Sequence, residues 1–171
     1  MKTKELVIMA LFAAIGAVLH SIMPPVLFGM KPDMMLVMMF MGILLFPRVQ
    51  NVLMIGIVTG IISALTTSFP GGQLPNIIEK PVTAFLFLAL ALLVKKSVKT
   101  AAAVITIAGT FISGLLFLAL ALLIVGLPGG FTALVLAVVL PAAALNAIAI
   151  IIMHPIVQTI LKRSNMIETV K

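Results

Sequence analysis

The sequence contains no cysteine, no tryptophan and no tyrosine, and only four of its 171 residues are acidic. Without cysteine the chain forms no disulfide and offers no thiolate ligand to a metal ion. Charged residues make up 9% and hydrophobic residues 63% of the chain, whereas an average globular domain has about 25% charged and about 45–50% apolar residues. This shortage of charge excludes an ordinary soluble domain and indicates an integral membrane protein.

Several functional motifs are also missing. No G-x-x-x-x-G-K-[ST] phosphate-binding loop occurs, so the chain is not itself an ATPase of that class. No H-E-x-x-H zinc motif occurs either, and we expect neither an enzyme nor a resident metal or cofactor. The net charge of +7 comes from basic residues at the ends of apolar segments, not from a basic stripe. It therefore does not indicate nucleic-acid binding.

The apolar residues are grouped into runs long enough to cross a bilayer, which takes about 20 helical residues. Proline, glycine and basic residues separate these runs. They predict an all-α protein with a single domain over residues 1–171, built as a bundle of six transmembrane helices. The expected spans are 5–22, 33–47, 50–68, 76–94, 101–126 and 131–161. The last is longer than a bilayer needs, so we expect tilt or a kink at Pro141 or Pro155.

The basic residues predict the orientation of the bundle. With the N-terminus in the cytoplasm, nine of the eleven lysines and arginines face inward, and only Lys31 and Lys80 face outward. This positive-inside bias favours an even number of spans with both termini cytoplasmic.

The stretch PGGQLPNIIEKP, residues 70–81, gathers polar side chains at the outer end of the fourth span. Pro81 biases Lys80 away from the helical region, so we expect an extended or loosely turned segment leading into a helix with Pro81 near its first turn. In one interpretation Glu79 interacts with the dipole of that helix and Lys80 reaches the lipid headgroups. In the other, both side chains turn toward one ligand.

A zwitterion is the ligand that this set of residues suits. An α-amino acid carries a carboxylate and an ammonium group, so it needs a cation, an anion and a few neutral hydrogen-bond partners in a dry pocket. Lys80, Glu79 and Asn76 supply that set within five residues, and Gln73 lies just upstream. The stretch therefore predicts a small-molecule site.

Other polar residues are candidates for the same site. Lys31 and Asp33 lie in the first outer hairpin as further ligands or a lid, although a solvated hairpin in which Asp33 caps the second helix is the favoured interpretation. Asn146 is the lone amide well inside the sixth span, where interhelical hydrogen bonding and ligand contact are equally open. His20, at the outer end of the first span, is a candidate rim residue, although an interfacial role is favoured.

Methionines are concentrated around the start of the second span. They are Met30, Met34, Met35, Met38, Met39 and Met41. Thioethers bind Cu(I), so a soft-metal pore is one interpretation. Adaptable packing against neighbouring helices is the favoured one, and we assign no metal site.

Small residues at helix-contact spacing occur in the first, third and fifth spans, where they let helices approach closely in lipid. Those of the later spans are Gly56, Gly60 and Ala64 in the third, and Thr106, Thr110, Ser113 and Gly114 in the fifth. We expect both sets to pack within the bundle. The first span has two registers, Ala10 with Ala14 and Ala13 with Ala17, which either pack inside or face another protein.

Several stretches resemble one known family. They are MKTKELVIMALFAAIGAVLH, MKPDMMLVMMFMGILLFPRVQN, GIVTGIISALTTSFPGGQLPNIIEKP, LLIVGLPGGF and HPIVQTILKRS. In these stretches, which run nearly end to end, the chain is similar to the tryptophan-uptake proteins of Bacillus and its relatives. Those proteins resemble the substrate-binding S components of energy-coupling factor (ECF) transporters.

The resemblance implies a six-helix bundle in a bacterial cell membrane, with both termini inside and the ligand near the outer face. It implies that L-tryptophan is the ligand and that the chain docks on a transmembrane T component carrying two cytoplasmic ATPase subunits. Alanines four apart in the first helix are the usual docking face of that family. Ala10 and Ala14 match this pattern, with Ala13 and Ala17 as a second register. The lack of tryptophan in the chain agrees with a protein made when tryptophan is scarce.

We therefore expect a substrate-binding subunit for L-tryptophan uptake, embedded in membrane lipid. Its candidate binding residues are Asn76, Glu79, Lys80, Asn146, Gln73, Lys31 and Asp33. An S component for a vitamin or a modified base, and an ion-coupled secondary amino-acid transporter, are the alternatives. A membrane enzyme or a structural subunit without a small ligand is a third.

Overall fold

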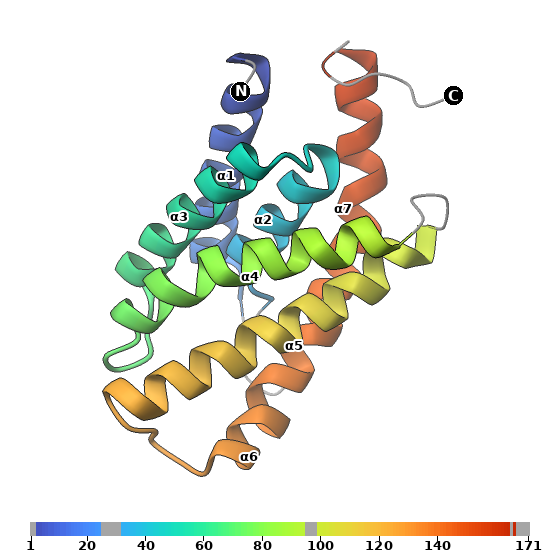
Figure 1. The fold of residues 1–171 in the computed structure, drawn as a ribbon. Coiled ribbons are helices and arrows are strands. Elements are labelled where there is room, and N and C mark those ends of the chain that lie inside the picture. Colours follow the sequence, from blue (N-terminus) through green and yellow to red (C-terminus); the bar gives the residue numbers. More distant parts are fainter. Residues whose placement is uncertain (1–2, 25–31, 95–98, 165, 167–171) are drawn as a thin grey trace.

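A computed structural model describes residues 3–24, 32–94, 99–164 and 166, and these residues form helices with no strand among them (Figure 1). The helices are α1 Thr3–Ile22, α2 Met34–Leu45, α3 Val49–Thr66, α4 Gln73–Leu93, α5 Lys99–Ile124, α6 Phe131–Leu134 and α7 Leu140–Arg163, with a π-helical segment, η1, at Val135–Val139. Five stretches are long and apolar enough to cross a membrane, with 131–163 counted as one, and α2 is a shorter apolar helix. The predicted six-helix membrane bundle is confirmed.

The two ends of the bundle differ. The start of α1 and the end of α7 lie at one end, whereas the α3–α4 and α5–α6 connections lie at the other (Figure 1). We call the second end the distal end. This arrangement agrees with the even number of spans that the basic residues predict.

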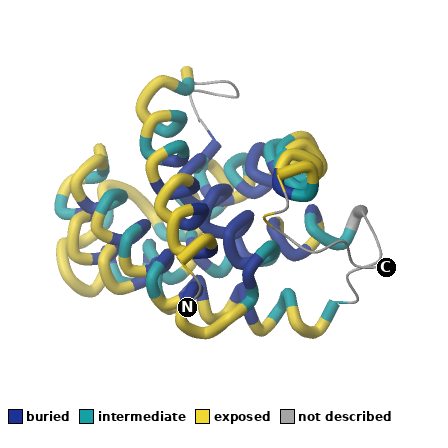
Figure 2. The backbone as a smooth tube through the Cα atoms, turned by 90° about the horizontal axis from the view of Figure 1, so that it is seen from above, coloured by how far each residue is buried: buried dark blue, intermediate teal, exposed yellow. Residues whose placement is uncertain are grey.

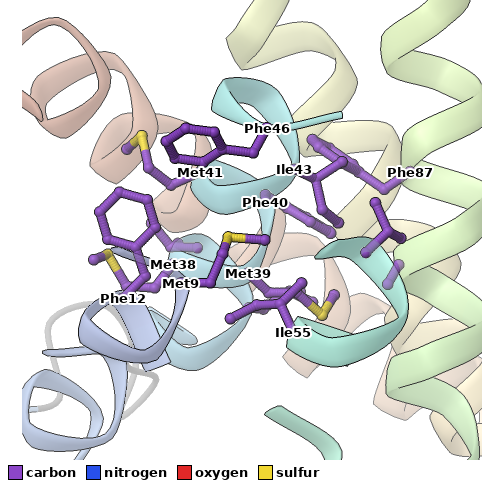
Figure 3. Packing of buried hydrophobic residues seen from close by; sticks show 14 of the residues in the cluster. Met9, Phe12, Met38, Met39, Phe40, Met41, Ile43, Phe46, Ile55 and Phe87 are labelled. Carbon is purple, nitrogen blue, oxygen red and sulfur yellow. The ribbon is translucent and has the colours of Figure 1, made fainter. Parts of the chain in front are cut away.

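Helix α2 forms the centre of the bundle. Every residue from Met34 to Ile43 is buried, as expected for a helix that is apolar on all sides. The buried residues gather in the middle of the bundle when it is viewed along its length (Figure 2). The methionines of α2 pack against neighbouring helices in the hydrophobic core, where Met38 and Met39 lie near Met9 of α1 and Ile55 of α3 (Figure 3).

The length of α2 decides where its first residues lie. Twelve residues make about 18 Å of helix, well short of a hydrocarbon core about 30 Å thick. The backbone N–H of Asp33, which caps α2, donates a hydrogen bond to Asn146 Oδ1 in the middle of the last span. Asp33 therefore lies against the interior of the bundle and not in a solvated turn, whereas residues 25–31 of the predicted hairpin fall outside the described residues.

A stacked pair of phenylalanines joins α2 to α4. The ring centroids of Phe40 and Phe87 lie 3.8 Å apart with an interplanar angle of 5°. Gly109 of α5 leaves room for this pair, because a Cβ on it would lie 2.6 Å from the Phe87 ring and 2.8 Å from the Phe40 ring.

The structure corrects the prediction for residues 73–81. They are helical throughout, because α4 begins at Gln73 and Pro81 lies inside it. Gly56 and Gly60 of α3 let α4 approach closely, and a Cβ on Gly56 would lie 3.0 Å from Pro81 Cα. A proline within a membrane helix is tolerated where a neighbouring helix packs against the distorted turn. The predicted packing role of these glycines is confirmed.

The helical register of α4 has a direct consequence for its polar side chains. Positions i, i+3, i+4 and i+7 share one helical face. Asn76, Glu79, Lys80 and Thr83 occupy those positions, and all four are buried. The acid and the base that are adjacent in sequence thus both point into the bundle.

The long last span departs from α-helical hydrogen bonding at η1. This segment ends two residues before Pro141, one of the two prolines at which we expected a distortion, whereas Pro155 lies inside continuous α7. Proline lacks the N–H that an α-helix uses, and π-helical turns are frequent at functional sites. Val139 at the end of η1 packs against Gly114 of α5, where a Cβ would lie 2.6 Å from it.

Candidate binding site

A cavity of about 480 Å³ lies toward the distal end of the bundle. Its size falls within the range of about 300–1,000 Å³ that is usual for small-molecule sites. Residues of α1 to α7, η1 and the two distal connections line it. Six of them are central to its chemistry, namely Asp33, Asn76, Glu79, Lys80, Ser113 and Asn146.

Three charged side chains meet at this cavity. Lys80 Nζ lies 2.6 Å from Glu79 Oε1 and 3.4 Å from Asp33 Oδ2. The side chain of Glu79 is 0% exposed and that of Lys80 5%, whereas that of Asp33 is 29% exposed. Buried charges persist only when they are paired. Among the described residues, Lys80 is the one lysine or arginine that pairs with these two carboxylates, so this group of three side chains carries one unbalanced negative charge.

Glu79 is held by partners on every side. Its Oε2 accepts hydrogen bonds from Thr83 Oγ1 at 2.9 Å and Ser113 Oγ at 3.0 Å, and its Oε1 contacts Lys80. Ser113 Oγ also accepts a hydrogen bond from Lys80 Nζ at 3.3 Å. Glu79 has no exposed surface and holds the Lys80 ammonium group through this contact, and Asp33 is the most exposed of the three charged side chains.

Asp33 links α2 to three other helices, namely α1, α4 and α7. Its Oδ1 accepts a hydrogen bond from the Leu36 N–H at 3.1 Å, so the predicted cap of α2 is confirmed. The same oxygen lies 3.7 Å from His20 Nδ1 at the distal end of α1. Its backbone N–H donates to Asn146 Oδ1 at 2.8 Å, and Asn146 Nδ2 donates to Thr110 Oγ1 of α5 at 3.2 Å. These bonds hold the Asp33 carboxylate in one position at the cavity wall.

The chemistry of the cavity suits a ligand that carries one positive and one negative group. The unbalanced carboxylate favours an ammonium group, which would pair with Asp33 as the more exposed of the two acids. The Lys80 ammonium, and nearby hydroxyl and amide groups, favour a carboxylate. An apolar remainder would be accommodated by Phe69, Phe117, Leu134 and Val138, which line other parts of the same cavity.

Sequence comparison identifies the family. The family model described as "Tryptophan transporter TrpP" matches residues 2–162 of the chain. The chain belongs to this family of tryptophan transporters. No solved structure matches the chain.

Relatives of this tryptophan transporter are named "Probable tryptophan transport protein". The one from Bacillus subtilis (strain 168) is 76% identical over 172 residues, covering 100% of each chain. The one from Clostridium acetobutylicum is 51% identical over 150 residues, covering 86% of this chain and 88% of its own. The one from Clostridium perfringens (strain 13 / Type A) is 40% identical over 176 residues, covering 96% and 97%.

The structure brings most of the predicted site residues of this transporter together. Asp33, Asn76, Glu79, Lys80 and Asn146 all line the cavity. The interpretation in which Glu79 interacts with the helix dipole and Lys80 reaches the lipid headgroups is wrong. Glu79 lies well inside α4, and the buried Lys80 ammonium group pairs with it.

The remaining two candidates lie elsewhere. Gln73 is exposed in the first turn of α4 and does not line the cavity. Lys31 falls outside the described residues. For the two amides at the cavity the structure shows the partners. Asn76 Nδ2 donates to the Gly72 carbonyl at 2.8 Å, and Asn146 makes interhelical bonds, one of the two interpretations left open for it.

Sequence analysis missed several cavity residues of this transporter. Thr110 and Ser113 were expected only to pack within the bundle, and Phe69 and Phe117 were not considered. The hydroxyl spacing along α5 was a usable signal, because hydroxyls inside an apolar helix face a polar partner more often than lipid. For the two phenylalanines no sequence signal distinguished them from the other eight in the chain.

The structure separates the two alanine registers of α1. Ala10 and Ala14 are exposed, whereas Ala13 is buried and Ala17 half-buried. The inner face of α1 packs on α2, where a Cβ on Gly16 would lie 3.2 Å from Met38 Cβ. Only the Ala10–Ala14 register remains available to another protein.

Proposed function

We propose that this chain is the substrate-binding membrane subunit for L-tryptophan uptake and that Asp33 and Lys80 bind the charged groups of the amino acid. The observation that carries this proposal is the cluster of two carboxylates and one ammonium group at the wall of a cavity of about 480 Å³. Family membership supports tryptophan as the ligand.

Binding follows from charge balance. The α-ammonium group of L-tryptophan pairs with Asp33 and neutralises the excess negative charge of the cluster. The α-carboxylate then pairs with Lys80, which Glu79 and Ser113 hold in place at 2.6 Å and 3.3 Å. Such charge-assisted bonds are strong in a site that excludes water. A ligand without the carboxylate loses its bond to Lys80, and a ligand without the ammonium group leaves the excess negative charge of the cluster unbalanced, so either one loses affinity.

The energy for uptake comes from other subunits in this proposal. The chain has no phosphate-binding loop of its own. Its α1 presents Ala10 and Ala14 on an exposed face beside Val7, Leu11 and Val18, and small residues allow another membrane helix to approach closely. This face docks on the T component of an ECF transporter with two cytoplasmic ATPases. Both termini are cytoplasmic, and the distal end faces the outside of a bacterial cell membrane.

Ligand fluorescence tests the proposal directly, because the chain contains no tryptophan and no tyrosine. Purified protein in detergent, excited at the red edge of indole absorption, is expected to be dark until L-tryptophan is added. We expect a saturable blue shift as the indole enters the cavity. Tryptamine and indole-3-propionate each lack one charged group, and in separate titrations each is expected to bind at least about tenfold more weakly than L-tryptophan.

Three results would contradict parts of the proposal. Emission that stays at the position of free indole at every protein concentration would exclude tryptophan binding. Equal affinity for all three indole compounds would exclude Asp33 and Lys80 as the charged contacts. Accumulation of L-tryptophan by the reconstituted chain alone under an ion gradient would replace the ECF assignment with ion-coupled transport.

A further inference from the structure

An aromatic contact forms part of the cavity wall at some distance from the charged cluster. The ring centroids of Phe69 and Phe117 lie 5.2 Å apart with an interplanar angle of 86°, an edge-to-face arrangement. Phe69 belongs to the α3–α4 connection and Phe117 to α5, and both line the cavity. Both side chains are only half-buried, although they are large and apolar.

The helices fix how this pair is placed relative to the charges. Phe117 follows Ser113 by four residues on α5, so the two share a helical face about 6 Å apart along the axis. Ser113 is the residue that bonds both Glu79 and Lys80. Phe69 precedes the first residue of α4, whereas Glu79 lies six residues into that helix, about 9 Å along its axis.

The cavity therefore has a polar part and an aromatic part, in that order toward the distal end. The charged cluster lies deeper in the bundle. Thr66, Thr67 and Ser68 line the cavity next to Phe69 in sequence, and the α5–α6 connection and the last span add apolar lining residues. These are Pro128, Leu134, Val138 and Val139.

An amino acid fits this order in only one direction. Its charged groups are attached to Cα, and in tryptophan a single CH₂ group separates Cα from the indole. With the charged groups at Asp33 and Lys80, the side chain extends along α5 toward Phe117. Aromatic rings favour edge-to-face or offset contacts with other rings, and the existing pair presents both an edge and a face.

We propose that Phe69 and Phe117 form the side-chain specificity site, which binds the indole ring and selects aromatic over aliphatic amino acids. This inference rests on the proposed function. It assigns ligand contacts to the α3–α4 connection, so that the turn of residues 67–72 contributes directly to selectivity.

Two single substitutions test the inference, Phe69→Leu and Phe117→Leu, because leucine keeps an apolar side chain but removes the ring. Phe111→Leu is the matched control, since Phe111 is half-buried on the same helix as Phe117 and does not line the cavity. Tryptophan affinity is measured from the blue shift of ligand emission. Competition by non-fluorescent L-leucine gives the preference for tryptophan over leucine.

We expect each cavity variant to bind tryptophan roughly three- to tenfold more weakly, while its affinity for leucine stays within twofold of the wild-type value. Leucine shares the charged groups of tryptophan, so retained leucine competition shows that the variant is folded and that the charged cluster is intact. The Phe111→Leu control is expected to keep the wild-type preference.

The outcomes are distinct. If wild-type protein binds tryptophan but both cavity variants keep the wild-type preference, the inference is overturned and the proposed function stands. If wild-type protein gives no tryptophan-dependent shift, the proposed function fails and the inference fails with it. Since Phe69 lies in a connection and Phe117 in a helix, loss of folding in one variant still leaves the other as a test.

Discussion

At the scale of single residues, Asp33 and Glu79 are chemically alike but have different surroundings. Asp33 is partly exposed to the cavity and caps α2, whereas Glu79 is fully enclosed and bonded to Lys80, Thr83 and Ser113. A carboxylate that retains exposed surface can accept a ligand. An enclosed one with all its partners in place contributes by positioning the cation.

This difference predicts that Asp33→Asn and Glu79→Gln behave differently. Asparagine caps a helix about as well as aspartate, so Asp33→Asn is expected to keep the apo melting temperature and to weaken tryptophan binding about tenfold or more. Glu79→Gln removes the closest partner of a buried lysine and is expected to destabilise the apo protein by about 1–3 kcal/mol. Thermal melting without ligand and fluorescence titration with ligand separate the two effects. A Glu79→Gln variant as stable as the wild type would contradict the positioning role.

At the scale of elements, glycines decide how closely the helices approach. Gly56 and Gly60 bring α3 against α4 at the turn around Pro81, and Gly109 of α5 leaves room for the stacked rings of Phe40 and Phe87. The α3–α4 contact keeps the polar face of α4 directed into the bundle. The space left by Gly109 lets α5, which supplies Thr110 and Ser113 to the cavity, pack against the core.

Gly109→Ala is the corresponding prediction. A methyl group there would lie 2.6 Å and 2.8 Å from two rings that are both 0% exposed. Overpacking a core costs about 1–3 kcal/mol, while alanine gains up to about 1 kcal/mol of helix propensity over glycine. We expect net destabilisation of roughly 1–2 kcal/mol, measured by thermal melting in detergent. Gly130→Ala is the control, because nothing lies within 4 Å of a Cβ at that position. Equal stability of both variants would show that the rings can move aside.

At the scale of the whole molecule, two polar clusters tie the helices together at different levels of the bundle. Toward the distal end, the Asp33 network joins α1, α2, α4, α5 and α7. At the end that holds the termini, Glu5 of α1 lies 3.0 Å from Arg48 and accepts a hydrogen bond from Asn51 at 2.9 Å. This second cluster fixes the rotation of α1, so that Ala10 and Ala14 face away from the bundle.

The exposed alanine face gives a prediction about uptake. The double substitution Ala10→Leu with Ala14→Leu adds bulk where the T component is proposed to dock. Tryptophan binding by the purified chain is expected to stay within twofold of wild type, while uptake by cells falls at least about tenfold, because close helix contact needs small residues. Ala144→Leu on the exposed side of α7 is the control. Lost binding in the double variant would mean that these alanines pack the bundle, and retained uptake would exclude them from docking.

Much of the architecture was determined by the sequence alone. Long apolar runs separated by proline, glycine and basic residues determine an all-helical membrane bundle, because a backbone in lipid must satisfy its hydrogen bonds within each span. The spans predicted from these runs agree with the observed helices to within about three residues at most ends. The sequence also identifies Asn76, Glu79 and Lys80 as site candidates, since an amide, an anion and a cation within five residues suit a zwitterion.

Which side chains meet depends on how distant helices pack. Lys80 and Asp33 are 47 residues apart in sequence and Asp33 and Asn146 are 113 apart, and no local pattern specifies such contacts. The continuation of α4 through Pro81 depends on the close approach of Gly56 on another helix, which outweighs the local preference of a residue before proline. The depth of Asp33 depends on α2 being short and enclosed by its neighbours. Local chemistry determined which elements form, and packing between distant elements determined the site.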